Sequence, residues 1–249
     1  ALVAFSGVNI TKSTFVHNVT TDSWGAIFFY AKIALIIDGS TFSNNQTKNL
    51  GGAIYASADD GTVTIGDSSF TGNQAESGGA LYNDATTIVN NSLFDANSGS
   101  REGGAIYTNG HGNINPGSLT VSNGSFINNS TDYSGSAIYA YYDITKIDGS
   151  TFANNFDTYV YDPILDNAGG GGVLVGAGGA LGITNSTFDS NTSTDGGTLI
   201  FERDQYNANN QYTATNVSFH NNTGTALLIF NYGPLPDQLI LKNTVLSGL

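Results

Sequence analysis

The stretch DSSFTGNQAESGGALY, residues 67–82, contains the two motifs that decide the fold of this chain. A phenylalanine is followed three residues later by an asparagine, and a Gly-Gly-Ala-aliphatic-aromatic motif comes shortly afterwards. The Phe/Asn motif occurs eight times in the 249 residues, with Phe-to-Phe steps of 27, 28, 24, 32, 26, 36 and 31 residues. Repetition at this period is typical of a solenoid, in which each repeat forms one coil.

The two repeated side chains are expected to have structural roles. Phenylalanine fills the core, and asparagine forms a buried ladder of stacked amides that satisfies backbone groups at a tight bend. Neither column is therefore expected to contact a ligand. The predicted structural ladder comprises Phe15, Phe42, Phe70, Phe94, Phe126, Phe152, Phe188 and Phe219, together with Asn18, Asn45, Asn73, Asn97, Asn129, Asn155, Asn191 and Asn222.

Mostly apolar residues also stand five and seven positions before each phenylalanine, as Ile37 and Leu35 do before Phe42. A spacing of two indicates one face of a β-strand, and the residue between them is expected to point outward. A turn follows, then the phenylalanine strand, and the Gly-Gly-Ala motif begins another strand. A coil of about 27 residues buries too little apolar surface to fold alone, so stability must come from stacking. The sequence therefore predicts an all-β, single-stranded parallel β-helix of about nine coils, with three short strands per coil.

Composition agrees with this class and excludes several functions. The chain has 32 glycines, 4 prolines and only 11% charged residues, which is typical of a turn-rich β protein. A net charge of −13 disfavours nucleic acid and anionic lipid as partners. Cysteine is absent, so disulfides and thiolate metal sites are excluded. No leader or apolar span is evident, and residues 1–249 are expected to form one β-helix domain, a segment of a longer solenoid, without direct membrane insertion.

The alternation of Gly-Gly-Ala-aliphatic with Phe-x-x-Asn resembles the polymorphic outer membrane protein repeat of chlamydial autotransporter passengers. The resemblance extends from Phe15 to about Leu228. It implies a right-handed β-helix of the pectin-lyase-like class at the cell surface, serving in adhesion. No catalytic residues are associated with this repeat.

Candidate binding residues lie where the repeat leaves the surface free to vary. If the aliphatic residue of the Gly-Gly-Ala motif points into the core, the next residue points outward, and Tyr55, Tyr82, Tyr107 and Tyr139 form an exposed stripe suited to sugar rings or a partner surface. If the alanine and the aromatic point inward instead, the stripe is core. The loop 202–211 carries the densest charge cluster, Glu202, Arg203 and Asp204. Ordinary surface solvation also explains that cluster.

Two function classes remain open. The first is a non-catalytic extracellular or cell-surface β-helix that acts as a stalk, fibre scaffold or adhesin. Its partners would be a host-cell or matrix protein or glycan, or other copies end to end. The second is a carbohydrate-binding or carbohydrate-active β-helix, as in polysaccharide lyases and hydrolases. Its candidate carboxylate pairs are Glu76 with Glu102 and Asp162 with Asp166. No catalytic residue, metal or cofactor is assigned, and exposed Asn-x-Ser/Thr sites would permit glycosylation.

Overall fold

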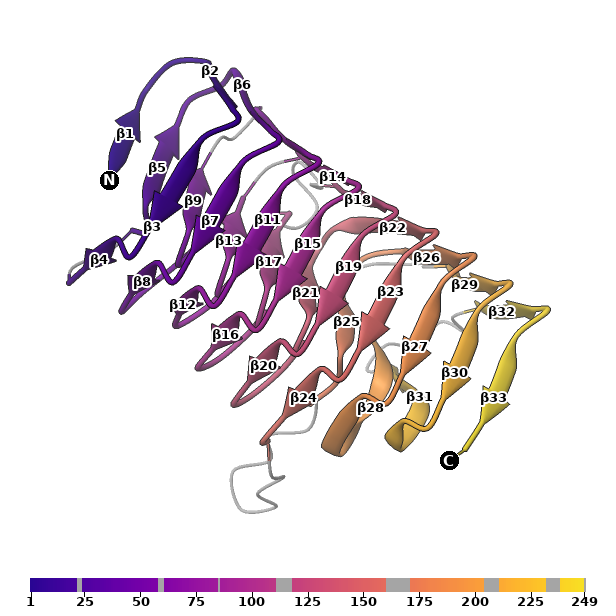
Figure 1. Ribbon diagram of the computed structural model, residues 1–249. Coiled ribbons are helices and arrows are strands. Elements are labelled where there is room, and N and C mark those ends of the chain that lie inside the picture. Colours follow the sequence, from indigo (N-terminus) through magenta and orange to yellow (C-terminus); the bar gives the residue numbers. More distant parts are fainter. Residues whose placement is uncertain are drawn as a thin grey trace.

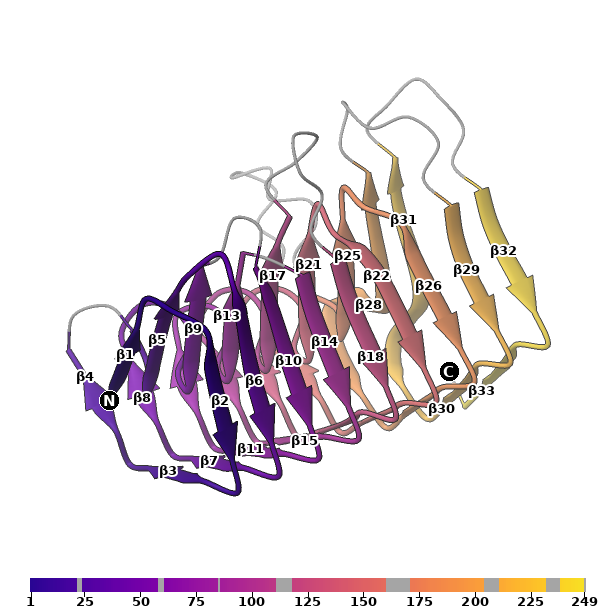
Figure 2. The ribbon, with the colours of Figure 1, turned by 90° about the horizontal axis from the view of Figure 1, so that it is seen from above.

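The computed structural model describes residues 1–21, 24–57, 61–84, 86–110, 118–159, 171–203, 211–231 and 238–248. These residues form a parallel β-solenoid, shown along its side in Figure 1 and from above in Figure 2. The two views show the chain winding clockwise as it recedes from the N-terminus, which makes the solenoid right-handed. The predicted fold class is therefore confirmed.

Three sheets run the length of the solenoid. The second sheet has nine strands: β2 (Val8–Thr11), β6 (Ala34–Asp38), β10 (Thr62–Gly66), β14 (Thr86–Asn90), β18 (Ser118–Ser122), β22 (Ile144–Asp148), β26 (Leu181–Thr184), β29 (Gln211–Thr215) and β32 (Gln238–Lys242). The third also has nine: β3 (Thr14–Val16), β7 (Thr41–Ser43), β11 (Ser69–Thr71), β15 (Leu93–Asp95), β19 (Ser125–Ile127), β23 (Thr151–Ala153), β27 (Thr187–Asp189), β30 (Ser218–His220) and β33 (Val245–Ser247).

The first sheet has two limbs. The Gly-Gly-Ala limb contains β1 (Leu2–Ala4), β5 (Ile27–Tyr30), β9 (Ile54–Ser57), β13 (Leu81–Asn83), β17 (Ile106–Asn109), β21 (Ile138–Tyr141) and β25 (Leu174–Ala177). A limb of two-residue strands contains β4 (Val19–Thr20), β8 (Gln46–Thr47), β12 (Gln74–Ala75), β16 (Ser98–Gly99), β20 (Ser130–Thr131) and β24 (Phe156–Asp157). The long strand β28 (Thr192–Arg203) joins the limbs and pairs with β31 (Thr223–Asn231). The repeated motifs do not predict the two-residue strands.

The register places like residues above one another in successive coils. Phe70 pairs with Phe42 on one side and Phe94 on the other, with ring centroids 4.7 and 4.8 Å apart and planes within 4° of parallel. From Phe42 to Phe219 each ring of this column is fully buried, while Phe15 in the first coil is partly buried. The spacing between coils thus matches the distance between the centroids of stacked rings. A phenylalanine in every coil therefore packs against the phenylalanine above it and the one below it.

The asparagine column forms a continuous hydrogen-bonded ladder. Asn73 Nδ2 donates to the Phe42 carbonyl at 3.0 Å and to Asn97 Oδ1 at 2.9 Å, and Asn97 Oδ1 also accepts the Asn73 backbone N–H at 3.0 Å. The pattern repeats from coil to coil. Of the ladder residues in Asn-x-Ser/Thr patterns, Asn45, Asn129 and Asn191 are completely buried and so inaccessible to a glycan, whereas Asn18 is half-buried.

Two bends in each coil require left-handed backbone. The residue three before each phenylalanine has positive φ, for example Asn91 at 49° and Asn123 at 54°, and so does the residue before most ladder asparagines, for example Asn44 at 53°. Asparagine and glycine tolerate this conformation with the least strain, which explains their frequency in the sequence.

A second polar ladder lies two residues before phenylalanine and was missed in the sequence. The Ser40 amide donates to Ser68 Oγ at 3.0 Å, and the Ser68 amide donates to Ser92 Oγ at 3.1 Å. Each hydroxyl also donates to a carbonyl two residues earlier, for example Ser68 to Gly66 at 2.6 Å. These buried serines therefore complete the corner between the second and third sheets.

Candidate functional site

The outward aromatic column of the first sheet is the most prominent surface feature in the described chain. Phe28, Tyr55, Tyr82, Tyr107 and Tyr139 lie in register on β5, β9, β13, β17 and β21. The aliphatic residue before each is completely buried, and these four tyrosines are each half-buried, so the outward direction holds. We call these five residues the aromatic ladder.

The rings of the aromatic ladder stack on one another along the solenoid axis. Successive centroids are 5.5, 5.3, 4.9 and 5.5 Å apart, with planes within 12° of parallel. Ring faces therefore cover each other, and the ladder presents ring edges and phenol groups to the outside. Sugar rings bind aromatic side chains through their faces, so the stripe does not offer the platform that sequence analysis expected.

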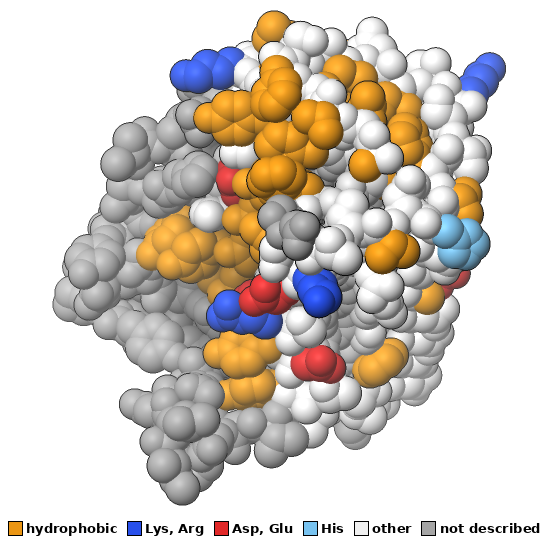
Figure 3. All heavy atoms as spheres, turned by 90° about the vertical axis from the view of Figure 1, so that its left-hand side faces the viewer, with side chains coloured by type: hydrophobic (Ala, Val, Ile, Leu, Met, Phe, Trp, Pro, Cys, Tyr) orange, Lys and Arg blue, Asp and Glu red, His pale blue; other side chains and the backbone are white. Residues whose placement is uncertain are grey.

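At its N-terminal end the aromatic ladder meets further exposed aromatic side chains. Trp24 packs on Phe28 with centroids 4.1 Å apart and is 44% exposed, and Phe5 packs edge-on against Phe28 at 6.0 Å and is 71% exposed. Trp24 and Phe28 also line a cavity of about 400 Å³ with Leu2, Val3 and Val19. Figure 3 shows hydrophobic side chains gathered on this end of the molecule.

At the other end the column becomes part of a second core. Val175 and Ile200 occupy the same register positions and are fully buried, packing with Ala177 against Tyr139 and Tyr141. In these two coils the residue after the aliphatic position is therefore buried and not exposed. The accessible part of the column therefore runs from Phe28 to Tyr139.

The phenols of Tyr55, Tyr82 and Tyr107 stay neutral at physiological pH. Burial, with Asp84 adding to it, raises the pKa of the Tyr55 and Tyr82 hydroxyls, and burial, with Glu102 adding to it, raises the pKa of Tyr107. These groups can donate and accept hydrogen bonds but do not supply a phenolate nucleophile. Their chemistry suits recognition more than catalysis.

Beside the aromatic ladder lies a small charged cluster centred on Arg101. Its guanidinium lies 3.4 Å from Glu76 Oε1 and 3.5 Å from Glu102 Oε1, and Ser77 donates to Glu102 Oε2 at 2.9 Å. Glu102 and Glu76 raise the pKa of Arg101. The candidate hydrolase carboxylates Glu76 and Glu102 are thus both paired with one cation.

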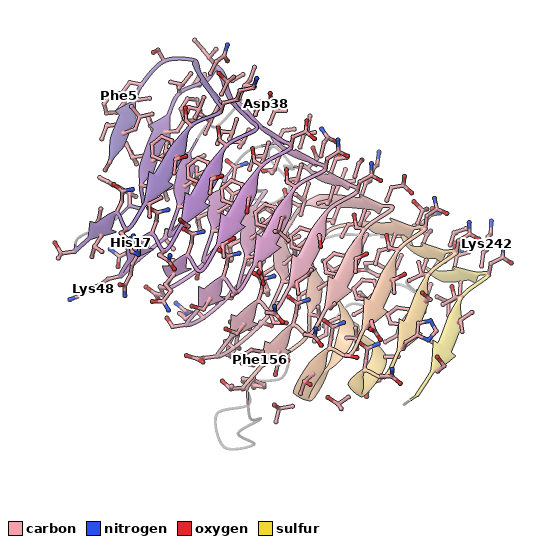
Figure 4. All side chains as sticks on the ribbon, in the orientation of Figure 1. Phe5, His17, Asp38, Lys48, Phe156 and Lys242 are labelled. Carbon is pink, nitrogen blue, oxygen red and sulfur yellow. The ribbon has the colours of Figure 1, made fainter. Side chains whose placement is uncertain are left out.

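A polar groove follows the limb of two-residue strands. It has a volume of about 530 Å³ and is lined by side chains that include Gln46, Gln74, Ser98 and Ser130. Lys48, Glu76 and Asp132 lie at the same groove. Figure 4 shows Lys48 and Phe156 pointing away from the coils on this side. Amide and hydroxyl groups in successive coils form a repeating hydrogen-bonding surface that sequence analysis missed, because the short strands carry no repeated motif.

The remaining candidates lie at the edge of the described structure. The backbones of Glu202 and Arg203 belong to β28, while their side chains and the whole of Asp204 lie outside the described residues. The candidate carboxylates Asp162 and Asp166 also lie outside them. In the described part of the chain, no group of three or more His, Cys, Asp or Glu side chains is arranged to hold a metal ion. No helix among the residues described is long and apolar enough to cross a membrane.

Comparison with known proteins identifies one repeat family. The Chlamydia polymorphic membrane protein repeat matches residues 39–57, 67–84 and 91–109, each of which contains one Phe-x-x-Asn and one Gly-Gly-Ala motif. No curated protein and no solved structure matches the chain. The matched segments cover less than a quarter of the chain but include three successive coils. The protein therefore carries repeats of the Chlamydia polymorphic membrane protein type within a parallel β-solenoid.

Proposed function

We propose that this protein is a non-catalytic cell-surface β-helix that holds adhesive surfaces away from the cell. The observation that carries this proposal is the division between interior and exterior. The repeated phenylalanine, asparagine and serine side chains contact the neighbouring coils inside the solenoid. The aromatic ladder, the Arg101 cluster and the polar groove occupy the outside of the same coils.

The repeat family supports a location at the cell surface, since its model is that of a membrane protein of Chlamydia. A net charge of −13 keeps such a surface soluble and repels anionic membranes. The proposed partner is a host-cell or matrix protein or glycan. End-to-end association with other copies is a further candidate.

Adhesion can be measured with beads that carry the purified chain. We expect saturable attachment to cultured cells, inhibited by excess soluble chain. Beads carrying the heat-denatured chain serve as the control. Equal attachment of native and denatured chains would contradict an adhesive role.

The second candidate is carbohydrate binding, favoured by the amide and hydroxyl groups of the polar groove and by the phenol groups at the edge of the aromatic ladder. A glycan array tests it with Tyr107→Phe and Tyr107→Ala as a matched pair. The phenylalanine variant keeps the stacked ring and removes the hydroxyl, whereas the alanine variant removes both. Saccharide binding that is lost in both variants would assign recognition to the phenol. Failure of the wild-type chain to bind any saccharide would leave a protein partner. Turnover of acidic polysaccharide that disappears in Arg203→Ala would contradict the non-catalytic assignment.

A further inference from the structure

The polar groove along the limb of two-residue strands is built from three parallel rows of residues. Its floor consists of small, buried residues, namely Thr47, Ala75 and Gly99. One wall follows two residues after the other and contains Lys48, Glu76, Ser100 and Asp132. The opposite wall belongs to an outward column that reads, in register through six successive coils, Val19, Gln46, Gln74, Ser98, Ser130 and Phe156.

The polar side chains of this outward column form no hydrogen bond within the described part of the chain. This applies to Gln46, Gln74, Ser98 and Ser130. Their backbone amides, by contrast, donate to a neighbouring coil, as Gln74 does to the Asn45 carbonyl at 2.9 Å. These amides are therefore not open to an extended peptide, which would pair through its backbone, whereas the side-chain amides and hydroxyls remain available to a ligand.

Stacked amides on another part of the surface do bond to one another. At the exposed corner between the second and third sheets, Asn91 Nδ2 donates to Asp67 Oδ1 at 3.2 Å, and Asn123 Nδ2 donates to Asn91 Oδ1 at 3.1 Å. The spacing between coils thus permits an outward amide ladder. Gln46 and Gln74 are also direct neighbours in register and form none. Their side chains therefore do not hold the coils together and can donate and accept hydrogen bonds outward.

An exposed aromatic ring continues the same column one coil beyond Ser130. Phe156 pairs with Ser130 on one side and with Thr192 on the other, and it is 43% exposed. Figure 4 shows its side chain directed away from the coils. Neither neighbour in the column carries a ring, so the faces of Phe156 are not covered as those of the aromatic ladder are. The column thus offers an aromatic face in line with amides and hydroxyls.

The charges at the groove indicate which kind of ligand suits it. Lys48 and Arg101 supply two positive charges, and Glu76 and Asp132 supply two negative charges. The groove is therefore locally balanced, whereas the whole chain carries a net charge of −13. A polyanionic ligand is repelled by the chain and meets no excess of cations in the groove. An uncharged ligand rich in hydroxyl groups avoids this penalty.

We propose that the column from Gln46 to Phe156 binds a linear, uncharged polysaccharide that lies along the solenoid axis. Sugar hydroxyl groups hydrogen-bond to the amide and hydroxyl side chains of successive coils, and one sugar ring packs on the face of Phe156. At a coil spacing of about 4.8 Å, the column spans about 19 Å, which requires an oligosaccharide and not a single sugar. The inference rests on the proposed function, because it names the partner of the adhesive surface.

The test is calorimetric titration of the full chain with uncharged hexasaccharides of glucose, mannose, galactose and xylose, and with the same monosaccharides. We expect at least one hexasaccharide to bind more tightly than its monosaccharide. Phe156→Ala should raise the dissociation constant about tenfold, the order of effect that aromatic platforms have on other flat ring ligands. Phe156→Tyr restores the ring and should recover the lost affinity. Gln74→Leu keeps the size of the side chain without its amide and should also weaken binding.

Ile144→Ala is the matched control, because Ile144 is also 43% exposed but lies on the second sheet, so this variant should bind as the wild type does. Circular dichroism checks that all variants fold. The proposal is overturned if no hexasaccharide binds at millimolar concentration, if Phe156→Ala and Gln74→Leu bind as the wild type does, or if a galacturonate hexasaccharide binds as tightly as the uncharged ones.

The bead assay separates failure of this proposal from failure of the proposed function. Beads that attach to cells although no hexasaccharide binds the chain would overturn the polysaccharide proposal and leave adhesion to a protein partner. Hexasaccharide binding that is weakened in Phe156→Ala, without attachment of the beads, would support the groove and contradict the adhesive role.

Discussion

Replacement of Asn129 by alanine tests the role of the asparagine ladder. Asn129 Nδ2 donates to the Phe94 carbonyl at 2.9 Å and to Asn155 Oδ1 at 3.0 Å, and its Oδ1 accepts both the Asn97 backbone N–H and Asn97 Nδ2 at 3.0 Å. All these groups are buried. The variant therefore loses four hydrogen bonds and leaves the Asn97 amide without its acceptor.

At about 1 kcal/mol for each hydrogen bond, the loss amounts to about 4 kcal/mol. The buried Asn97 amide, which is left without an acceptor, adds a further cost to this loss. This is a large share of the roughly 5–15 kcal/mol by which domains are stable. Urea unfolding followed by circular dichroism measures the change. Asn90→Ala is the matched control, because Asn90 lies on the outward side of β14 and should change stability by less than about 0.5 kcal/mol. Equal stability of the two variants would refute the ladder argument.

Three further predictions concern packing, backbone approach and pH. Phe126→Ala removes a fully buried ring that stacks on both neighbours at 4.9 Å, and calorimetry should show a loss of about 3–5 kcal/mol. Gly79→Ala directs a methyl group into the Gly104 carbonyl oxygen and should destabilise by about 3 kcal/mol in urea, whereas Gly66→Ala, whose methyl meets only Asp38 Oδ1 at 3.2 Å, should be tolerated. The Asp143 pKa of about 7 in the folded state, against 3.8 unfolded, favours the protonated folded state. Its stabilising effect is therefore full below pH 3.8 and lost as pH rises through 7, on the order of 4 kcal/mol, and stability curves of Asp143→Asn should lack this fall.

The fold could be predicted from the sequence because each coil carries the same side chain at the same position, and these side chains stack on one another. A repeated residue predicts its own neighbours. Phe42 and Phe94 must lie on either side of Phe70, and Asn45 and Asn97 must lie on either side of Asn73. The same spacing also covers the ring faces of the aromatic ladder. A coil spacing near the stacking distance of rings leaves edges exposed.

The buried polar residues were harder to predict because they belong to no repeated motif. Asn83, Thr87, Thr108 and Thr145 replace apolar residues in otherwise regular columns, and only the register shows which coils and columns they occupy. Asp143 looks like an ordinary turn residue in the sequence. Its burial depends on coils on either side, which no local pattern encodes.

The central claim is that the repeated interior supports the fold while the variable exterior recognises the partner. The most direct measurement pairs protease resistance with bead adhesion for single substitutions at Asn97 and Tyr107. We predict that Asn97→Ala lowers adhesion only in proportion to the loss of resistant chain, and that Tyr107→Ala lowers adhesion per resistant molecule. A fully resistant Asn97→Ala chain that no longer adheres would contradict the claim.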